Sequence, residues 1–508
     1  MAPNKDESSL QLRMSAPKHQ ICDLLIDIAR TTLKDSEEEA DICGFCDTMH
    51  HLSDNDRENV AYLCGMHMFF SLSFMDGIRG YETEAKSLAQ GRDVVRNVVS
   101  KINAAFTDSN CSIMFICFDS GSPPEKHMTQ SKRSTDIEPY EWDGESPIIL
   151  EHVEVPNWKR LLANRPARYR AIEELFDLVA LSPQLHRDPH HVIFVDMPGK
   201  LLEIGVSGPI VHPAVHTEES DFGIIKSLKL LHSWKPSLGY LRMHQPKVKY
   251  LMASIPDTDA VTSMIQLHHF DFVKPVDITI LLAKRFEKDG DDQKKHRYIS
   301  FTPLIRNLKR ALGQRSIDDL LATALFGGGD YCSKLQRTSY KNLFGALMEM
   351  PEELKLCEHG TGPDGNTLIT GLNRKAFFWL YTKAYVDGIN SRRRNNKIEC
   401  DDLGPNPLRR GHAIVSGAGS DQQIASNVHS VRIFERHLRT VLWYVTYTYH
   451  SCLGRALFEQ MPMPCGLKFG GWTLEKGDRI YAKPKTLTEA LAQSDLLCNE
   501  TLWVHHSS

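Results

Sequence analysis

The chain has 508 residues and a formal net charge of −4, and 41% of its residues are apolar while 24% are charged. This length predicts two or three domains or one elaborated domain, and the charge excludes a globally basic nucleic-acid-binding protein. No run approaches the roughly 18 continuous apolar residues of a membrane span, and the N-terminus lacks the apolar region of a signal peptide. We therefore expect a cytoplasmic or nuclear protein with no membrane partner.

Residues 1–67 are predicted to form an N-terminal segment that contains an amphipathic helix near 21–33. Two knuckle-like pairs follow the helix: Cys43 with Cys46, and Cys64 with His67. Zinc prefers four thiolate or imidazole ligands, and closely spaced pairs are how short zinc modules usually supply them. The spacing therefore predicts one structural Zn²⁺. His50 or His51 could replace His67 as the fourth ligand. The alternative is that these are ordinary buried cysteines with a surface histidine.

The next stretch has the pattern of a strand, an acid, a helix and a second strand. The apolar run 68–75 is predicted to be a central strand that runs into Asp76, and the apolar spacing over 81–106 indicates a helix. A second apolar run, 113–118, ends at Asp119. Such βαβ units imply a parallel sheet, whose ligands bind at the carboxyl ends of the strands.

Donor side chains follow Asp119 closely: Lys126, Gln130 and Arg133. Cationic and amide donors close to an acid that could hold a metal ion suit a phosphate substrate. The alternative is an ordinary strand, a proline turn and a solvated basic helix.

Further along, apolar patterns predict three more helices and three more strands. These are helices 158–181, 224–231 and 317–326 and strands 192–196, 201–206 and 248–253, the second of which enters a loop at 207–217. The stretch 284–297 is predicted to be a surface connection, and most of the aromatic residues at 377–381 are predicted to lie in the core.

Acidic residues again follow these elements. Glu219 and Asp221 precede the helix at 224, where capping is the alternative explanation, Asp257 and Asp259 follow the strand at 248–253, and Asp330 follows a run of three glycines. Mutual repulsion requires cations to neutralise such a group of acids. Hard oxygen ligands near a phosphate indicate Mg²⁺ or Mn²⁺, and two ions can clamp the oxygens of an in-line displacement.

We therefore predict a site with two metal ions. Its metal ligands are Asp76, Asp119, Glu219, Asp221, Asp257, Asp259 and Asp330, and all of these except Asp76 are also predicted to be catalytic.

The motifs around these acids resemble the 5′-nuclease superfamily with its PIN-like fold, which includes flap endonucleases, and they are most similar to the Xrn 5′→3′ exoribonucleases. FDSGSPPEKHMTQSKR is similar to DGxAPxxKMxQQRxRR of that family, and VSGPIVHPAVHTEESDFGII is similar to SGPxxPGEGEHKI. YLMASIPDTDAV resembles YGLDADLI, and LATALFGGGDYC resembles the GNDF or GSDY motif. The resemblance extends over residues 68–450 and implies that Lys126, Gln130 and Arg133 hold an RNA 5′-monophosphate.

The resemblance also implies a fold. We expect an α/β protein with a mainly parallel central sheet flanked by helices and a mostly helical C-terminal part. The expected divisions are a catalytic domain at 68–345, a helical extension at 346–460 and a C-terminal tail at 461–508.

Some residues depart from the family pattern. Phe222 and Gly223 replace a His-Lys pair, and Asp76 lies two residues late when the family's first acidic segment is aligned. Arg337 and Ser339 replace the glycines of the duplex-binding hairpin of flap endonucleases, which favours single-stranded RNA over duplex DNA.

The sequence thus predicts a Mg²⁺-dependent exoribonuclease that degrades single-stranded RNA with a 5′-monophosphate, with DNA as the alternative substrate. Two other functions stay open. One is a structure-specific flap-type endonuclease on RNA or DNA, and the other is a catalytically inactive nucleic-acid-binding scaffold of the same fold.

Overall fold

The structure is a computed structural model that describes fourteen stretches of the chain. They are residues 19–31, 42–46, 60–65, 90–118, 138–155, 158–197, 200–213, 249–255, 276–288, 294–327, 339–361, 367–391, 472–475 and 481–484, together with the single positions 227, 261, 264 and 265. Among the described helices, none is both long enough and apolar enough to cross a membrane.

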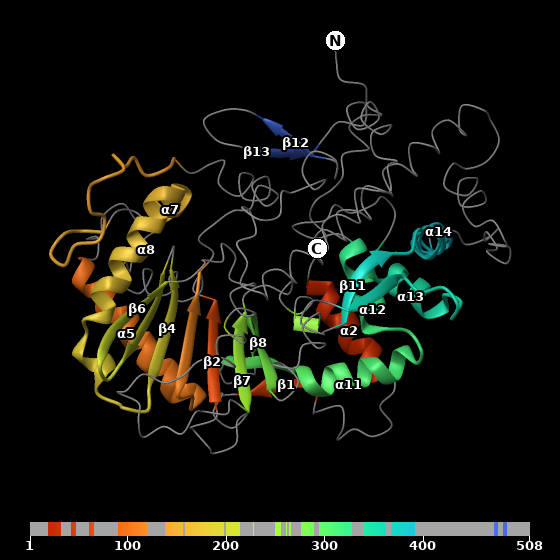
Figure 1. Cartoon of the computed structure of the whole chain (residues 1–508), viewed down its shortest axis with the longest axis horizontal. Helices are drawn as coiled ribbons and strands as arrows, with labels where there is room; N and C mark the ends of the chain where they lie inside the picture. The colour runs from red at the N-terminus through yellow and green to blue at the C-terminus, as the bar shows by residue number, and fades with distance from the viewer. Residues whose placement is uncertain are drawn as a thin grey trace, which may run out of the picture.

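The described helices alternate with strands over much of the chain (Figure 1). They are α2 (His19–Arg30), α5 (Gly91–Ser109), α7 (Trp158–Ala163), α8 (Arg165–Ala180), the short 3-10 helix η3 (Pro183–His186), α11 (Phe301–Leu312), α12 (Ile317–Phe326), α13 (Tyr340–Glu349) and α14 (Arg374–Asn390). The helices predicted near 21–33 and at 317–326 are confirmed as α2 and α12.

The described strands form one large sheet and two hairpins. They are β1 (Cys43–Cys46), β2 (Val60–Gly65), β3 (Ile113–Cys117), β4 (Val192–Met197), β5 (Lys200–Gly205), β6 (Gly208–Pro213), β7 (Tyr250–Ile255), β8 (Asp277–Lys288), β9 (Lys294–Ser300), β10 (Cys357–Thr361), β11 (Thr367–Leu372), β12 (Trp472–Glu475) and β13 (Tyr481–Pro484). The strands predicted at 113–118, 192–196, 201–206 and 248–253 are confirmed.

The large sheet has the order β1-β9-β8-β7-β2-β3-β4-β5-β6. Its central strands, from β8 to β4, pair in parallel, whereas β9, β1, β5 and β6 pair antiparallel at the two edges. The fold is therefore α/β, but the prediction of a mainly parallel sheet is wrong because the sheet is mixed. Short connections explain the antiparallel pairs β4–β5 and β5–β6, since two-residue turns can join only antiparallel neighbours.

Two segments that the sequence assigns to connections are strands at these edges. The predicted loop after residue 206 contains β6, which pairs with β5 across a turn at 206–207. Gly208, directly after this turn, has a φ of +92°. The predicted surface connection at 284–297 lies within the β8–β9 hairpin. Glycine and two prolines gave β6 the pattern of a loop, and charged residues concealed the β8–β9 hairpin, although both segments pair their backbones.

The described central strand that precedes α5 is β2, at residues 60–65, and the predicted strand at 68–75 lies outside the described residues. Both β1 and β2 fall within the predicted N-terminal segment 1–67, yet they pair within the large sheet. In the predicted extension at 346–460, the hairpin β10–β11 precedes α14. The predicted tail contains a second hairpin, β12–β13.

Two predicted helix boundaries shift for local reasons. The helix predicted from residue 81 begins at Gly91, whose N–H donates to the carbonyl of Val153 at 3.0 Å, and a Cβ at Gly91 would lie 2.0 Å from the carbonyl oxygen of Leu150. The helix predicted over 158–181 is divided because the Asn164 side chain caps α8 by accepting from the N–H of Ala167 at 3.2 Å.

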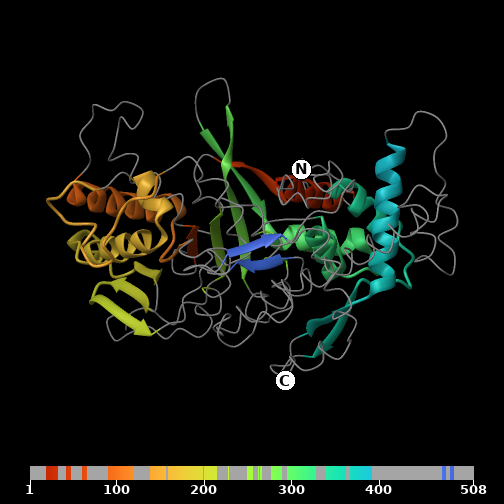
Figure 2. The ribbon, with the colours of Figure 1, turned by 90° about the horizontal axis from the view of Figure 1, so that it is seen from above.

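One face of the β3–β5 region is covered by α5 and α8. Alternate residues of β3 and β4, such as Met114 and Val195, pack with α5 and α8 residues in one buried cluster. The intervening Phe115 and Phe194 face the opposite side, where their rings stack with centroids 5.0 Å apart. Figures 1 and 2 show α5, α7 and α8 around the β3–β6 end of the sheet.

A second helical layer lies at the other end of the sheet. Helix α11 packs against α2 and α12, and α13 packs against α2, α12 and α14, so these five helices form a continuous group (Figures 1 and 2). Trp379 and Tyr381 of α14 are buried, in agreement with the prediction that most of this aromatic run belongs to the core.

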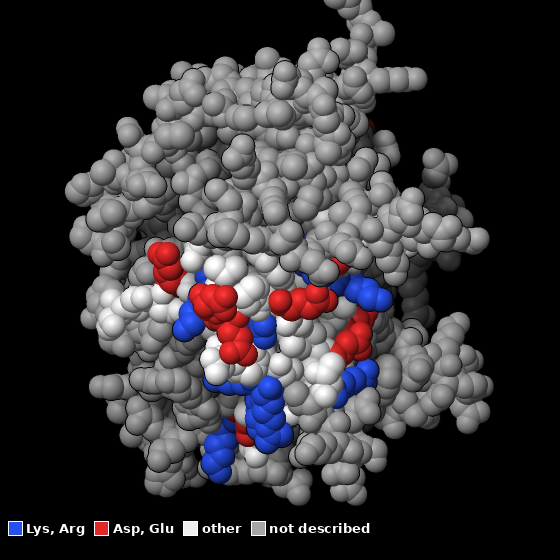
Figure 3. Space-filling model, turned by 90° about the vertical axis from the view of Figure 1, so that its right-hand side faces the viewer, with Lys and Arg blue, Asp and Glu red and all other residues white. Residues whose placement is uncertain are grey.

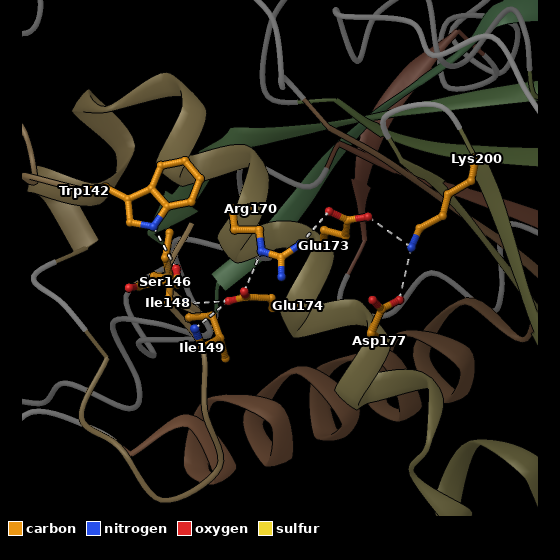
Figure 4. Close-up of polar contacts among 9 residues, drawn as sticks. All are labelled: Trp142, Ser146, Ile148, Ile149, Arg170, Glu173, Glu174, Asp177 and Lys200. Atoms are coloured by element: carbon orange, nitrogen blue, oxygen red, sulfur yellow. Dashed lines mark hydrogen bonds and ion pairs between the residues drawn. The ribbon is translucent and has the colours of Figure 1, made fainter. Parts of the chain in front are cut away.

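The loop at 138–155 is fastened to α8 by one carboxylate (Figure 4). Glu174 accepts hydrogen bonds from the backbone N–H groups of Ile148 and Ile149 at 2.7 and 2.8 Å, and from Arg170 at 2.7 Å. Glu173, one residue earlier, makes longer ion pairs with Arg170 and Lys200 at 3.5 and 3.3 Å. Glu174 therefore holds the backbone of the loop, whereas Glu173 only joins side chains at the surface.

We predict that Glu174→Ala destabilises the protein and that Glu173→Ala does not. The first change leaves two buried N–H groups without an acceptor, each at a cost of about 1–3 kcal/mol, so the free energy of unfolding should fall by at least about 2 kcal/mol. The second removes half-exposed ion pairs worth about 0–1 kcal/mol. Urea unfolding of the two variants tests this, and equal midpoints would contradict it.

Candidate functional site

The carboxyl ends of three central strands lie level with one another. In the pairing of β2 with its neighbours, Cys64 is opposite Ile116 of β3 on one side and Ser254 of β7 on the other. Gly65 is opposite Cys117, and β7 ends at Ile255 in the same row. Along the chain, β2 is followed by β3, which pairs with one edge of β2, and the later strand β7 pairs with the other edge of β2. The strand order thus reverses between β2 and β7, which is where open α/β sheets bind ligands.

Two of the predicted acidic positions follow this level edge at the same distance. Asp119 comes two residues after Cys117, and Asp257 comes two residues after Ile255. The strands they follow, β3 and β7, are separated by β2 alone, which is about 10 Å between strand axes. Both acids, and Asp259 beside Asp257, lie outside the described residues. The backbone that leads to them nevertheless leaves the sheet from one place.

A contact across the edge brings in a third segment. The side chains of Cys117 and Ser227 meet with Sγ and Oγ 3.7 Å apart, and both residues are buried. Ser227 is helical and follows Asp221 by six residues. Glu219 and Asp221 lie outside the described residues, but the segment that carries them returns to the carboxyl end of β3.

The structure reveals a buried acid at this edge that the sequence analysis missed as a site residue. Asp196 lies near the end of β4, whose Val195 is opposite Ile116 of β3, so Asp196 is in the same row as Cys117. Its side chain is 5% exposed. An acid that follows four apolar residues, Val192 to Val195, was the signal available in the sequence, and it is the same signal that pointed to Asp119.

The remaining predicted ligands are Asp76 and Asp330, and both lie outside the described residues. Asp76 comes eleven residues after the end of β2, and the strand predicted directly before it also lies outside the described residues. Asp330 comes three residues after Gly327, the residue that directly follows α12. Gly327 packs so closely against Tyr340 that a Cβ at this position would lie 2.3 Å from the tyrosine ring. The position from which the chain proceeds to Asp330 is therefore fixed by packing.

The segment with the predicted phosphate-binding residues is held at both ends. It begins at the carboxyl end of β3 and ends at residue 138, where Arg160 Nε donates to the Glu138 carbonyl at 3.2 Å. Asn164 Nδ2 then donates to the Tyr140 carbonyl at 2.6 Å. Lys126, Gln130 and Arg133 themselves lie outside the described residues. Their segment spans from the candidate edge to α7 and α8.

The predicted zinc site is not compatible with the sheet. Cys43 and Cys46 belong to β1, whereas Cys64 belongs to β2, and β9, β8 and β7 lie between these strands. Four spacings of about 4.8 Å separate the two strands by roughly 19 Å, whereas a zinc–sulfur bond measures about 2.3 Å. The prediction that these cysteines share one ion is therefore wrong, and His67 lies outside the described residues. Cys43 instead accepts a hydrogen bond from Arg30 at 3.7 Å.

Within the described ranges, no three His, Cys, Asp or Glu side chains converge closely enough to hold a metal ion. On the molecular face that Figure 3 shows, the described residues present interspersed acidic and basic side chains and no broad patch of one sign.

No protein-family model matches the chain, and no curated protein matches it at a significant level.

A second polar pair lies on the same sheet, two strands from β3. Glu203 of β5 is 1% exposed, and its Oε2 meets Nε2 of His212 on β6 at 2.7 Å. Within the described part of the chain, Glu203 Oε1 is buried without a hydrogen-bond partner. His212 is 42% exposed, so it links a buried carboxylate to the surface. A buried charge with a single partner depends strongly on that partner.

We predict that His212→Ala lowers the free energy of unfolding by about 1–3 kcal/mol, because both oxygens of Glu203 then lack a partner. Adding Glu203→Leu to His212→Ala should restore part of the loss, since the buried carboxylate is also removed. His190→Ala, at an exposed histidine, is the control. Urea midpoints of the three variants measure these changes, and a double variant less stable than His212→Ala would refute the interpretation.

Proposed function

We propose that the chain is a metal-dependent 5′→3′ exoribonuclease that acts on single-stranded RNA with a 5′-monophosphate. The observation that carries the proposal is the level ending of β3 and β7 on either side of β2, because the chain proceeds from this edge to Asp119 and Asp257. The contact between Cys117 and Ser227 adds support, since it returns the segment after Asp221 to the same edge.

The donor set of the proposed site fits Mg²⁺ or Mn²⁺, since it consists of carboxylate oxygens, the ligands that hard cations prefer. The ligands would be Asp76, Asp119, Glu219, Asp221, Asp257, Asp259 and Asp330. Two such ions, when bound, would stabilise the charge that develops on the reacting phosphate. The buried Asp196 adds a carboxylate in the row of Cys117.

The donors after Asp119 would grip the terminal phosphate of the RNA. Lys126 and Arg133 supply charge, and Gln130 supplies an amide N–H, so together they suit a phosphate monoester with its two negative charges. A site that recognises this group requires a free 5′ end. The anchoring of the segment through Glu138 and Tyr140 supports a defined position for these donors.

Two other functions follow from particular features of the same residues. A flap-type endonuclease on RNA or DNA would use the same acids without needing the terminal phosphate. A catalytically inactive nucleic-acid-binding scaffold is favoured by Phe222 and Gly223, which replace the basic pair of the exoribonuclease motif. The retention of carboxylates at Glu219, Asp221 and Asp257 opposes it, because like charges repel unless cations neutralise them.

The deciding experiment presents one labelled RNA with a 5′-monophosphate, with a 5′-triphosphate and as a circle, in Mg²⁺, Mn²⁺ or chelator. We expect metal-dependent loss of the monophosphorylated RNA alone. Cleavage of all three forms would support the endonuclease, and failure to cleave any of them, or matched DNA, would support the scaffold.

We predict that Asp257→Ala lowers the cleavage rate by more than about 100-fold, because loss of a direct ligand should exceed the 10–100-fold effect of an outer partner. The variant should unfold at the same urea concentration as the parent or a higher one, since it removes a repelling charge. Glu352→Ala, at an exposed position before β10, is the control and should cleave at the parent rate. Unchanged cleavage by Asp257→Ala would refute the assignment of the site.

We also predict that Lys126→Ala lowers kcat/KM for monophosphorylated RNA by roughly 10–100-fold, the equivalent of one charge-assisted hydrogen bond of about 1.5–3 kcal/mol. RNA with a 5′-hydroxyl should be affected much less. Lys309→Ala, on the exposed face of α11, serves as the control for a general loss of positive charge. An equal loss on both substrates would show that Lys126 does not recognise the phosphate.

A further inference from the structure

Two adjacent carboxylates at the start of α12 fasten this helix to the hairpin β10–β11. Asp318 Oδ2 meets Nε2 of His359 at 2.7 Å, and Asp319 Oδ1 accepts from the backbone N–H of Cys357 at 2.8 Å. Both aspartates are 1% exposed. Cys357 and His359 are two residues apart on β10, with a shift in the β10–β11 register between Glu358 and His359, and each of them meets one of the two aspartates. We name these four residues the latch.

The local sequence explains why the aspartates are at this end of the helix. Ser316 precedes α12, and its hydroxyl accepts from the N–H of Asp319 at 3.1 Å, as in a helix cap. Negative charge in the first helical turn is also favoured by the helix dipole. Capping accounts for Ser316 and Asp319, and the helix dipole favours both aspartates. In addition, Asp318 meets the imidazole on the hairpin, so it also has a role between elements.

The other end of α12 is held by packing. Gly327 lies directly against Tyr340 of α13, a side chain that is 1% exposed. The helix between the latch and Gly327 has ten residues, about 15 Å at 1.5 Å per residue. A short helix fixed at both ends moves as a unit. The chain that leaves it reaches Asp330 three residues later.

We propose that Asp318 and His359 are positioning residues of the proposed nuclease reaction. Their ion pair fixes the position of α12 and thereby that of Asp330, and the ion pair weakens when His359 loses its proton. This inference rests on the proposed function for its link to Asp330. The latch itself consists entirely of described residues and can be tested apart from activity.

The charges around His359 favour its protonated form. The hydrogen bond to Asp318 raises the pKa of His359, burial lowers it, the charges of Asp318 and Asp319 raise it, and Lys355 lowers it, with a net increase. Burial raises the pKa of Asp319 against the hydrogen bonds from Cys357 and Ser316. Burial also raises the pKa of the Cys357 thiol well above its ordinary value, so this thiol stays protonated.

The direction of the pH dependence follows from linkage. A histidine whose pKa is higher in the folded state contributes its full stabilisation below its unfolded value, about 6.5, and loses it as pH rises through the folded value. Asp319 acts in the same direction, but its contribution is full only below its unfolded value of about 3.9 and is lost as pH rises through its raised folded value. His359 therefore controls the window above about pH 6.5, and the latch should weaken there.

Hydrogen exchange of the α12 amides tests the latch in the full-length protein. In the parent chain, protection corrected for intrinsic exchange should fall several-fold between pH 6 and pH 9, because His359, whose pKa is raised by its hydrogen bond to Asp318, loses its proton over this range. His359→Gln keeps a hydrogen-bond donor that does not titrate, so its protection should not change with pH. His359→Ala should be poorly protected at both pH values, and His152→Gln, at an exposed loop histidine, should behave like the parent.

Cleavage assays with the same variants test the link to the reaction. His359→Ala should need several-fold more Mg²⁺ for half-maximal cleavage, and His359→Gln should restore the parent requirement at pH 6. If α12 protection in the parent does not change with pH, or is unaffected in His359→Ala, the latch is refuted even if RNA is cleaved. If protection responds but the Mg²⁺ requirement does not, the positioning role is refuted. If the parent cleaves no nucleic acid, the proposed function fails, while the hydrogen-exchange results still show whether the latch stabilises α12 and depends on pH.

Discussion

The backbone pairing of the central parallel strands is the constraint on which the rest of this structure depends. Every residue of β3 is buried, so each of its N–H and C=O groups must pair with β2 or β4. A shift of the register by one residue would turn every side chain to the opposite face and expose the cluster that packs against α5 and α8. The strands therefore end at fixed, level positions, and the places where the chain leaves the sheet are determined with them.

The helices and loops around the sheet are held by a few buried carboxylates. Glu174 binds two backbone N–H groups of the loop at 148–149, Asp319 binds that of Cys357, and Glu203 binds His212. Each of these acids joins two elements that are distant or reversed in the chain. A carboxylate in this setting gains strong hydrogen bonds that offset the loss of water. These are structural acids, and none of them requires a metal ion.

The acids of the proposed site are of a different kind, because in the sequence Asp119 and Asp257 come two residues after the ends of β3 and β7 and join no two described elements. On the proposed function they converge at the edge where the strand order reverses, close to the segment that carries Lys126 and Arg133. An RNA 5′ end would meet both groups there. Attraction between the ions and the phosphate would then balance the repulsion among the carboxylates. The two helical layers act at a distance, by fixing the backbone positions from which these segments extend.

The sequence by itself determined the α/β class, the strands β3, β4 and β7 and the helices α2 and α12, because apolar periodicity reports directly on burial. It also identified the acids that follow β3 and β7. It could not determine the sheet order, which makes one zinc site for Cys43, Cys46 and Cys64 impossible, nor the pairing of β6 and of the β8–β9 hairpin. Those features depend on contacts between residues far apart in the chain. Only the tertiary structure decided that Asp196 is buried beside Cys117, and that Asp318 faces His359 and not solvent, because a carboxylate in sequence looks the same whether its partner is water, a backbone N–H or an imidazole.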